Sequence, residues 1–275
     1  MCRVTGKTFR ALAVALFATL ISLPPSLAAT CGNTSAGFNR WVGEAKKEAA
    51  AKGFNQRTIN ATLGNVSYSR KTINADRNQK SFKLSLNQFM KKRGAATIVR
   101  QGKQLKAKNK KLFASLERRY GVPPGPLLAI WGMETGFGRF MGNSDTISAL
   151  ATLAYDCRRS AFFTKELYAA MTIIQQGQLS RKQMRGAGHG ELGHTQFLPS
   201  SYLKFAVDGD GNGRKDLVGS KTDALASTAN YLRAYGWKRG RGYQPGQANF
   251  RAIKAWNAAS VYQQSIAIIG QQIDN

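Results

Sequence analysis

The stretch Leu127–Gly142, LLAIWGMETGFGRFMG, places one carboxylic acid, Glu134, in apolar surroundings. Glu134 follows Leu127 by seven residues and Trp131 by three, so in a helix it lies on the same face as these large apolar side chains. A carboxyl group in this position loses hydration, which raises its pKa and lets it hold a proton at neutral pH. Such a group can serve as the general acid that protonates a glycosidic oxygen.

The residues on either side of this acid predict where its helix begins and ends. Residues 123–126, PPGP, favour a helix start, because proline is accepted in the first turn. Gly136 and Gly138 favour a helix end and leave the backbone beyond the acid open to close approach. The structural alternative is a glutamate at the edge of the core that bonds to the backbone or to an arginine such as Arg139, since structural ion pairs also perturb acids.

A second group of polar residues has the spacing of a metal-binding loop. Residues 208–219, DGDGNGRKDLVG, place oxygen side chains at positions 1, 3 and 5, glycine at position 6 and a main-chain carbonyl at position 7. This spacing matches the first half of an EF-hand-like calcium loop, but position 12 is Gly219 and not the bidentate glutamate. A turn without metal is the structural alternative. The predicted ligands are Asp208, Asp210, Asn212, the carbonyl of Arg214 and, in place of the glutamate, Asp223.

The elements that would position these residues are predicted to be helices, so the fold class is mainly α. Apolar residues recur at helical spacing over most of the chain, and no run shows the sustained alternation of a strand. Helices are expected at Thr146–Tyr155, after Ser160 and at Ala224–Tyr235. The basic segment 94–120 also has a helical core face and a solvated outer face. Residues 186–193, GAGHGELG, form a glycine-rich loop in which the backbone can approach a ligand.

The chain of 275 residues has 41 basic and 14 acidic residues and a formal charge of +27. Its length suits one large domain or two small ones. The charge implies an acidic partner, which can be nucleic acid, an anionic membrane surface or a charged extracellular polymer.

Residues 1–29 have the order of a secretory signal peptide. Basic residues precede an apolar run at 11–23, and small residues before position 30 suit cleavage after Ala28 or Ala29. The run is short for a bilayer span, so a retained anchor is the weaker interpretation. We therefore expect a mature chain, residues 30–275, that is periplasmic or secreted and has no transmembrane anchor. Export also argues against DNA or RNA as the partner.

Two cysteines, Cys31 and Cys157, remain after the leader is removed. In an oxidising compartment two cysteines can pair, and the bridge would connect the mature N-terminus to the segment after the Glu134 helix. The alternative is two independent thiols.

Several motifs together resemble the lytic murein transglycosylase B family. They are AIWGMETGFGRFMG, ALATLAYDCRR, GHTQFLPSSY, VDGDGNGRKDL, NYLRAYGW and AWNAASVY, and they occur in the same order. The resemblance implies a fold similar to goose-type lysozymes, with a helical N-terminal part at about 30–120, a catalytic core at about 121–275 and an EF-hand-like calcium loop. It implies cleavage of peptidoglycan between N-acetylmuramic acid and N-acetylglucosamine, with a 1,6-anhydromuramic product.

The resemblance also implies roles for individual residues. Glu134 would be the sole catalytic acid and base, calcium the one cofactor and peptidoglycan glycan strands the partner. The residues that match substrate-contacting or cleft positions are Arg158, Arg159, Gln196, Tyr231, Asn257 and Tyr262. Two positions depart from the pattern. Ala187 stands where many members have serine, and the loop past Leu217 is one residue longer before Asp223.

A single carboxylate is chemically sufficient for this reaction. Ordinary glycosidases need two acids, whereas here the muramyl 2-acetamido group and C6 hydroxyl of the sugar can replace the second. Glu191, in the glycine-rich loop, is the nearby candidate for a second acid. The alternatives are a hydrolytic lysozyme and a non-catalytic peptidoglycan-binding scaffold.

Overall fold

The computed structural model describes residue 1, residues 29–78 and residues 83–275. Residues 2–28 of the predicted signal peptide therefore lie outside the described residues. No helix in the described part of the chain is long and apolar enough to cross a membrane. The described elements are a 3-10 helix η1 (Ser35–Gly37), α1 (Phe38–Ala51), α2 (Gln56–Leu63), α3 (Arg70–Arg77), α4 (Leu86–Arg93), α5 (Ala95–Lys108), α6 (Lys110–Tyr120), α7 (Pro124–Thr135), β1 (Ser144–Asp145), α8 (Thr146–Tyr155), α9 (Ser160–Gln175), β2 (Arg185–Gly186), α10 (Pro199–Phe205), α11 (Lys221–Ala234), α12 (Phe250–Trp256) and α13 (Ser260–Asp274).

The mainly helical class is confirmed, and the two strands are only a short antiparallel pair. Ser144 of β1 pairs with Gly186 of β2, and Asp145 pairs with Arg185. This pairing brings the start of the glycine-rich loop to the start of α8.

Helix α7 is the centre of the packing. Leu127, Leu128, Ala129 and Ile130 are each 0% exposed, because the helix is apolar on all its sides and is covered on all of them. It packs against α5 and α13, and α13 also packs against α5. The partial burial of Glu134 thus comes from the covering helices, and not from one apolar face.

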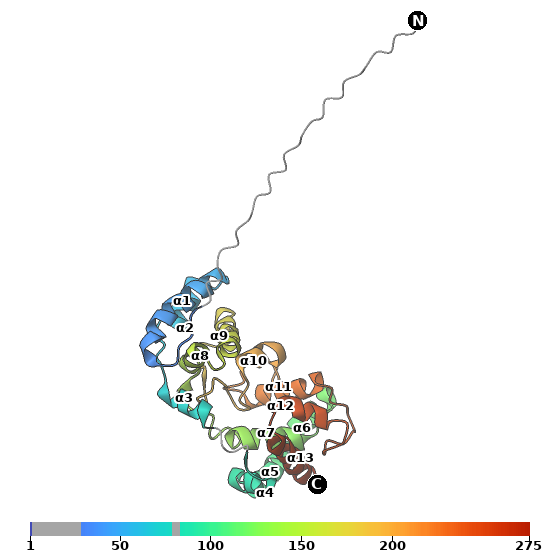
Figure 1. Cartoon of the computed structure of the whole chain (residues 1–275). Coiled ribbons are helices and arrows are strands. Elements are labelled where there is room, and N and C mark those ends of the chain that lie inside the picture. The colour runs from blue at the N-terminus through green and yellow to red at the C-terminus, as the bar shows by residue number, and fades with distance from the viewer. Residues whose placement is uncertain (2–28, 79–82) are drawn as a thin grey trace.

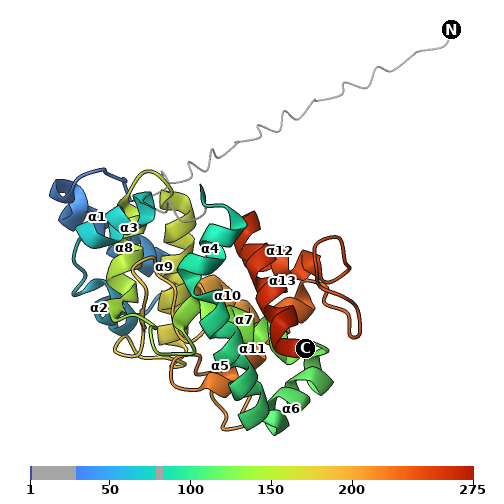
Figure 2. The same cartoon turned by 90° about the horizontal axis from the view of Figure 1, so that it is seen from below.

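The remaining helices lie on either side of this centre. Figure 1 and Figure 2 both show α1, α2, α3 and α8 toward one end of the molecule and α6, α12 and α13 toward the other. Helices α8 and α9 pack together, and α10 packs against α9 and α11. The hydrophobic core runs through both the N-terminal part and the predicted catalytic core, for example from Trp41 and Phe89 to Ile130 and Ile266.

Local sequence signals explain most helix ends. Ser85 and Gln88 form a capping box at the start of α4. Pro123 precedes α7, and Gly136 ends it in the left-handed conformation, as expected. The Ser220 side chain caps α11 by accepting a hydrogen bond from the Asp223 backbone N–H, so this helix begins three residues before the predicted Ala224.

Three features of the helices differ from the sequence-based expectation. The segment 94–120 is two helices, because Asn109 leaves helical geometry between α5 and α6. Helix α3 was not predicted, since its eight residues include only one large apolar side chain, Ile73. Ser160 is the first residue of α9, and Arg159 is its N-cap.

A disulfide joins Cys31 to Cys157, as favoured from the sequence. Two hydrogen bonds reinforce this connection: the Gly32 backbone N–H donates to the Tyr155 carbonyl at 2.9 Å, and the Tyr155 hydroxyl donates to the Thr34 carbonyl at 2.8 Å. The chain before α1 is therefore attached to the end of α8.

Candidate active site

Glu134 lies in the last turn of α7 and accepts two hydrogen bonds from the C-terminal helices. The Tyr262 hydroxyl, from α13, donates to its Oε1 at 2.6 Å, and the Trp256 indole N–H, from α12, donates to the same oxygen at 3.1 Å. Among the described residues no hydrogen bond reaches Oε2, which is therefore available to a ligand. Arg139 donates to Gln101 and not to Glu134, so the structural alternative of an ion pair with Arg139 is not observed.

Glu134 lines a cavity of about 550 Å³. Its walls come from α4, α7, the glycine-rich loop, and the helices α10 to α13. The other lining residues are Arg93, Ala187, His189, Glu191, Gln196, Phe197, Leu198, Ser201, Tyr231, Ala255, Trp256, Asn257 and Tyr262. The cavity combines apolar and aromatic surface with a few polar groups, which is typical of a small-molecule or glycan site.

The surroundings of Glu134 let a large fraction of it stay protonated up to neutral pH. Loss of hydration raises the pKa of Glu134 to about 7, against the hydrogen bonds from Tyr262 and Trp256, which lower it. The charge of Glu191 adds to the increase, and the charge of Arg93 opposes it. Hydration is lost because the helices around α7 enclose it, so the fold itself produces the raised pKa expected from the sequence.

The segment after the glycine-rich loop is fixed to the end of α7. The Thr135 hydroxyl donates to the His194 carbonyl at 2.6 Å, and the Trp131 indole N–H donates to His194 Nδ1 at 3.2 Å. Gly138 has a φ of +85°, and a Cβ there would lie 2.5 Å from His194 Nδ1, so only glycine allows this approach. These contacts place residues 194–198 beside Glu134.

Four of the six predicted substrate residues line the same cavity: Gln196, Tyr231, Asn257 and Tyr262. The Gln196 side chain donates to the Gly193 carbonyl at 2.7 Å, and Gln196 itself has a φ of +51°. The Tyr231 hydroxyl donates to the Ala255 carbonyl at 2.6 Å. These bonds hold the cavity wall in shape, and Tyr262 contacts the acid directly.

The other two predicted substrate residues, Arg158 and Arg159, are not among the cavity-lining residues. Both guanidinium groups form ion pairs with the buried carboxylate of Asp76, which connects the start of α9 to α3. Their side chains are 44% and 43% exposed, so both keep surface that a ligand can reach.

Trp256 and Arg93 are the main site residues that sequence reasoning did not assign. Trp256 lies in the AWNAASVY motif together with Tyr262, but a tryptophan in such a motif can equally pack in the core. Arg93 is the last residue of α4 and lies in a run of basic residues, where the sequence does not distinguish one cation from its neighbours.

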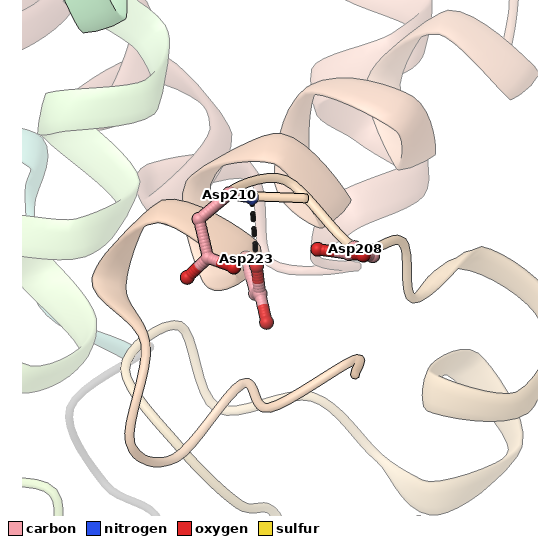
Figure 3. Close-up of side chains that lie close together, drawn as sticks. All are labelled: Asp208, Asp210 and Asp223. Atoms are coloured by element: carbon pink, nitrogen blue, oxygen red, sulfur yellow. Dashed lines mark hydrogen bonds between the residues drawn. The ribbon is translucent and has the colours of Figure 1, made fainter. Parts of the chain in front are cut away.

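The predicted metal loop brings three carboxylates together. Asp208, Asp210 and Asp223 each offer an oxygen, and these oxygens lie within 4.8 Å of one another (Figure 3). Figure 3 shows the Asp210 backbone N–H donating to Asp223 Oδ1, at 3.3 Å. Asp223 is fully buried and also accepts from the backbone of Gly209 and Asp216, at 2.8 Å each.

The other two predicted metal ligands follow in the same loop. The Asn212 side chain accepts from the Arg214 backbone N–H at 2.8 Å, and both residues are exposed. The donor set contains only oxygen atoms, which fits a hard cation such as Ca²⁺.

Residues 37–245 match the protein family described as "Transglycosylase SLT domain". A curated relative, membrane-bound lytic murein transglycosylase B of Escherichia coli strain K12, is 40% identical over 122 residues. This match covers 44% of the chain and 34% of the relative, so the chain spans about a third of the length of the curated relative that it matches.

Solved structures of lytic transglycosylases have the same fold. SltB3 from Pseudomonas aeruginosa, in complex with NAG-NAM-pentapeptide, has a TM-score of 0.81 and 29% identity, covering 86% of this chain and 80% of that one. Slt35 from Escherichia coli, in complex with calcium, has a TM-score of 0.73 and 24% identity, covering 91% and 97%. The family match extends from α1 to the loop before α12 and includes Glu134 and the acidic loop. The chain therefore belongs to the transglycosylase SLT domain family.

Proposed function

We propose that the protein is a peptidoglycan lytic transglycosylase that cleaves the β-1,4 bond between N-acetylmuramic acid and N-acetylglucosamine and forms 1,6-anhydromuramic acid. The observation that carries this proposal is Glu134, a carboxyl group with a pKa of about 7 in the wall of a 550 Å³ cavity. The relatives agree: SltB3 structures contain NAG-NAM-pentapeptide and NAG-anhNAM-pentapeptide, which correspond to an uncut and an anhydro-ended glycan.

Protonated Glu134 gives its proton to the glycosidic oxygen as the bond to C1 of the muramyl residue breaks. The bond electrons stay with the leaving oxygen, and the carbonyl oxygen of the muramyl 2-acetamido group stabilises the positive charge at C1. The C6 hydroxyl oxygen of the same sugar then bonds to C1, and its proton moves to the Glu134 carboxylate. The acid is restored, and no water is consumed.

The residues around Glu134 support each step of this reaction. Tyr262 and Trp256 hold Oε1 by hydrogen bonds, so the orientation of the carboxyl group is fixed while Oε2 exchanges the proton. Their bonds also stabilise the carboxylate that forms after the first step. Arg93 adds positive charge at the same cavity.

Gln196, Tyr231 and Asn257 have the cavity positions needed to contact the sugar rings. We assign Arg158 and Arg159 to the approach of the substrate outside this cavity, where their exposed surface suits the carboxylates of the peptide stem.

The experiment that tests this function is mass spectrometry of fragments released from purified sacculi by the wild-type protein and by Glu134→Gln. We expect anhydro-ended muropeptides, each one water lighter than the hydrolysis product, from the wild type and none from Glu134→Gln. Hydrated reducing ends would identify a lysozyme, above all if Glu191→Gln were as inactive as Glu134→Gln. Binding to sacculi with no release of fragments by the wild type would identify a scaffold.

We also propose that the acidic loop binds Ca²⁺ through Asp208, Asp210, Asn212, the Arg214 carbonyl and Asp223, and that the ion stabilises the fold. The close approach of three carboxylates supports this, since their mutual repulsion is relieved by a cation. Addition of millimolar CaCl₂ to EDTA-treated protein should raise its Tm, and the double variant D208N/D210N should lose this increase. An equal increase in both proteins would contradict the site.

We propose that the protein works outside the cytoplasm, in the periplasm or secreted. The disulfide between Cys31 and Cys157 supports an oxidising compartment, and the formal charge of +27 suits the negatively charged cell wall. N-terminal sequencing of the protein from a cell-envelope fraction tests the expected cleavage after Ala28 or Ala29.

A further inference from the structure

A second carboxyl group, Glu191, faces the cavity that Glu134 lines, and the proposed reaction does not use it. Its Oε2 is buried and has no hydrogen-bond partner among the described residues. The ring nitrogen Nδ1 of His189, which also lines the cavity, is 4.0 Å from this oxygen; this distance allows an ion pair when His189 is protonated, but it is beyond hydrogen-bonding distance. Buried polar oxygens in native proteins nearly always have a partner, so this one needs an explanation.

The backbone holds Glu191 in this position. Gly190 has a φ of +94°, and a Cβ there would lie 2.3 Å from the Leu150 side chain. On the other side, Leu192 exchanges two backbone hydrogen bonds with Phe197, each of 3.0 Å. A Cβ at Gly186 would lie 1.8 Å from the Glu191 carbonyl, so the start of the loop is packed against this residue as well. The carboxyl group is thus presented to the cavity by a fixed loop.

A buried acid with a structural role, Glu166, has hydrogen-bond donors for both of its carboxylate oxygens. Glu166, in α9, is 2% exposed and accepts hydrogen bonds from the Ser200 backbone N–H at 2.9 Å and from the Ser200 hydroxyl at 2.6 Å. Both of its oxygens have donors within the protein. Glu191 has no comparable donor for Oε2, although an unpaired buried carboxylate oxygen is costly.

We propose that Glu191 binds the substrate by accepting a hydrogen bond from an N–H or O–H group of an N-acetylated sugar in the cavity. This inference rests on the proposed function, because the glycan supplies the donor. Amide N–H and hydroxyl groups are the donors that such sugars carry, and a fixed carboxylate is a stronger acceptor for them than a neutral group. The strongly basic protein has many cations for the anionic parts of peptidoglycan, whereas Glu191 is suited to the neutral sugar rings.

The test uses Glu134→Gln as the parent, so that turnover does not disturb the measurement. Calorimetry gives the affinity for chitotetraose, a β-1,4-linked N-acetylglucosamine oligomer without peptide. We expect Glu134→Gln/Glu191→Gln to bind about tenfold more weakly than the parent, since a charge-assisted bond is replaced by a neutral one. Glu134→Gln/Glu191→Ala, which removes both acceptor oxygens, should bind more weakly still. The matched control is Glu134→Gln/Glu117→Gln, because Glu117 is an exposed acid on α6 and its loss changes the net charge equally.

The stability of the ligand-free protein separates substrate binding from a structural role. Glu191→Gln should have a Tm equal to or above that of the wild type, because the fold supplies no hydrogen-bond donor to the Oε2 that it replaces. A lower Tm would show that Glu191 has a partner in the fold, and unchanged affinity would show that it does not contact the sugar. Either result overturns the inference.

The same affinity measurement with cellotetraose, which has hydroxyl groups but no acetamido group, shows which donor Glu191 accepts from. If the tenfold difference in affinity between Glu134→Gln and Glu134→Gln/Glu191→Gln is also found with cellotetraose, the donor is a hydroxyl group. If the difference is found only with chitotetraose, the donor is the acetamido N–H. These binding results do not depend on the products of the reaction. If the wild type released no anhydro-ended fragments, the proposed function would fail while the sugar-binding role of Glu191 could still be measured.

Discussion

At the residue scale, Glu134 depends on the balance between lost hydration and two hydrogen bonds. Burial favours the protonated form, and the donors Tyr262 and Trp256 favour the carboxylate. The net result is a pKa of about 7, at which the group can give a proton in one step and take one back in the next.

This balance predicts the pH dependence of the reaction. The proposed reaction requires that Glu134 be protonated in the free protein, and its pKa is about 7, so kcat/KM should be constant below neutral pH and fall about tenfold per pH unit well above 7. The release of soluble fragments from labelled sacculi at several pH values and constant ionic strength measures this. If kcat/KM rose as the pH increased through 7, the carboxylate would be the active form in the free enzyme, and the assignment of Glu134 as the first acid would be wrong.

Tyr262→Phe should shift the fall in kcat/KM to higher pH. The variant removes the 2.6 Å hydrogen bond that stabilises the Glu134 carboxylate, so the pKa of Glu134 should rise, by about one unit. Titration of the ¹³C-labelled Glu134 carboxyl group by NMR measures the shift even if turnover is slow.

Tyr243→Phe is the matched control for this change. The Tyr243 hydroxyl donates to the Asp274 carboxylate at 2.7 Å, so it is another buried tyrosine–carboxylate pair, and Tyr243 does not line the cavity. This variant should leave the pKa of Glu134 unchanged. A downward shift in Tyr262→Phe would mean that the hydroxyl mainly stabilises the protonated acid.

At the scale of elements, the site depends on how closely α7 and α13 approach each other. Glu134 is at the end of α7 and Tyr262 is near the start of α13, so the distance between the helices sets the distance between the two side chains. Gly125 makes the approach possible, because a Cβ there would lie 2.2 Å from the Gly270 carbonyl oxygen.

Gly125→Ala should therefore destabilise the protein by about 1–3 kcal/mol, the usual cost of overpacking, and reduce activity. Gly43→Ala is the matched control, since this glycine lies inside α1 and a Cβ there meets nothing within 4 Å. It should stabilise the protein by up to about 1 kcal/mol through helix propensity. Urea denaturation of both variants gives the two free energies. Equal stabilities of Gly125→Ala and the wild type would mean that α7 and α13 can separate without cost.

The ends of single elements follow from local residues, whereas contacts between distant elements do not. The ends of α7 could be predicted because proline and glycine act locally, and Glu134 could be singled out because it is the one acid in an apolar stretch. The two-residue strand pair could not be predicted, because its pairing partners are at least forty residues apart in the chain. Helix α3 could not be predicted either, because its one large apolar residue gives no periodic signal. The donors to Glu134 come from residues more than 120 positions away, so their contact follows only from the packing of α7, α12 and α13.

At the scale of the whole molecule, the cavity is lined by segments that lie between residue 93 and residue 262 of the chain. Arg93 comes from the N-terminal part, and Tyr262 comes from the last helix. The predicted division into an N-terminal part and a catalytic core therefore does not divide the site, since α5 packs on both α7 and α13. Conditions that destabilise either the N-terminal part or the catalytic core should therefore change the same cavity.

The disulfide that attaches the N-terminal segment should stabilise the whole molecule. The disulfide between Cys31 and Cys157 joins positions 126 residues apart, so its loss should lower the free energy of unfolding by about 2–4 kcal/mol. Neither cysteine lines the cavity, so activity at 25 °C should remain while the Tm falls when dithiothreitol is added. The double variant Cys31→Ser/Cys157→Ser should have the same low Tm with and without dithiothreitol. An unchanged Tm on reduction would show that the hydrogen bonds of Gly32 and Tyr155 alone hold the segment, and immediate loss of activity would show that this end of α8 controls the cavity.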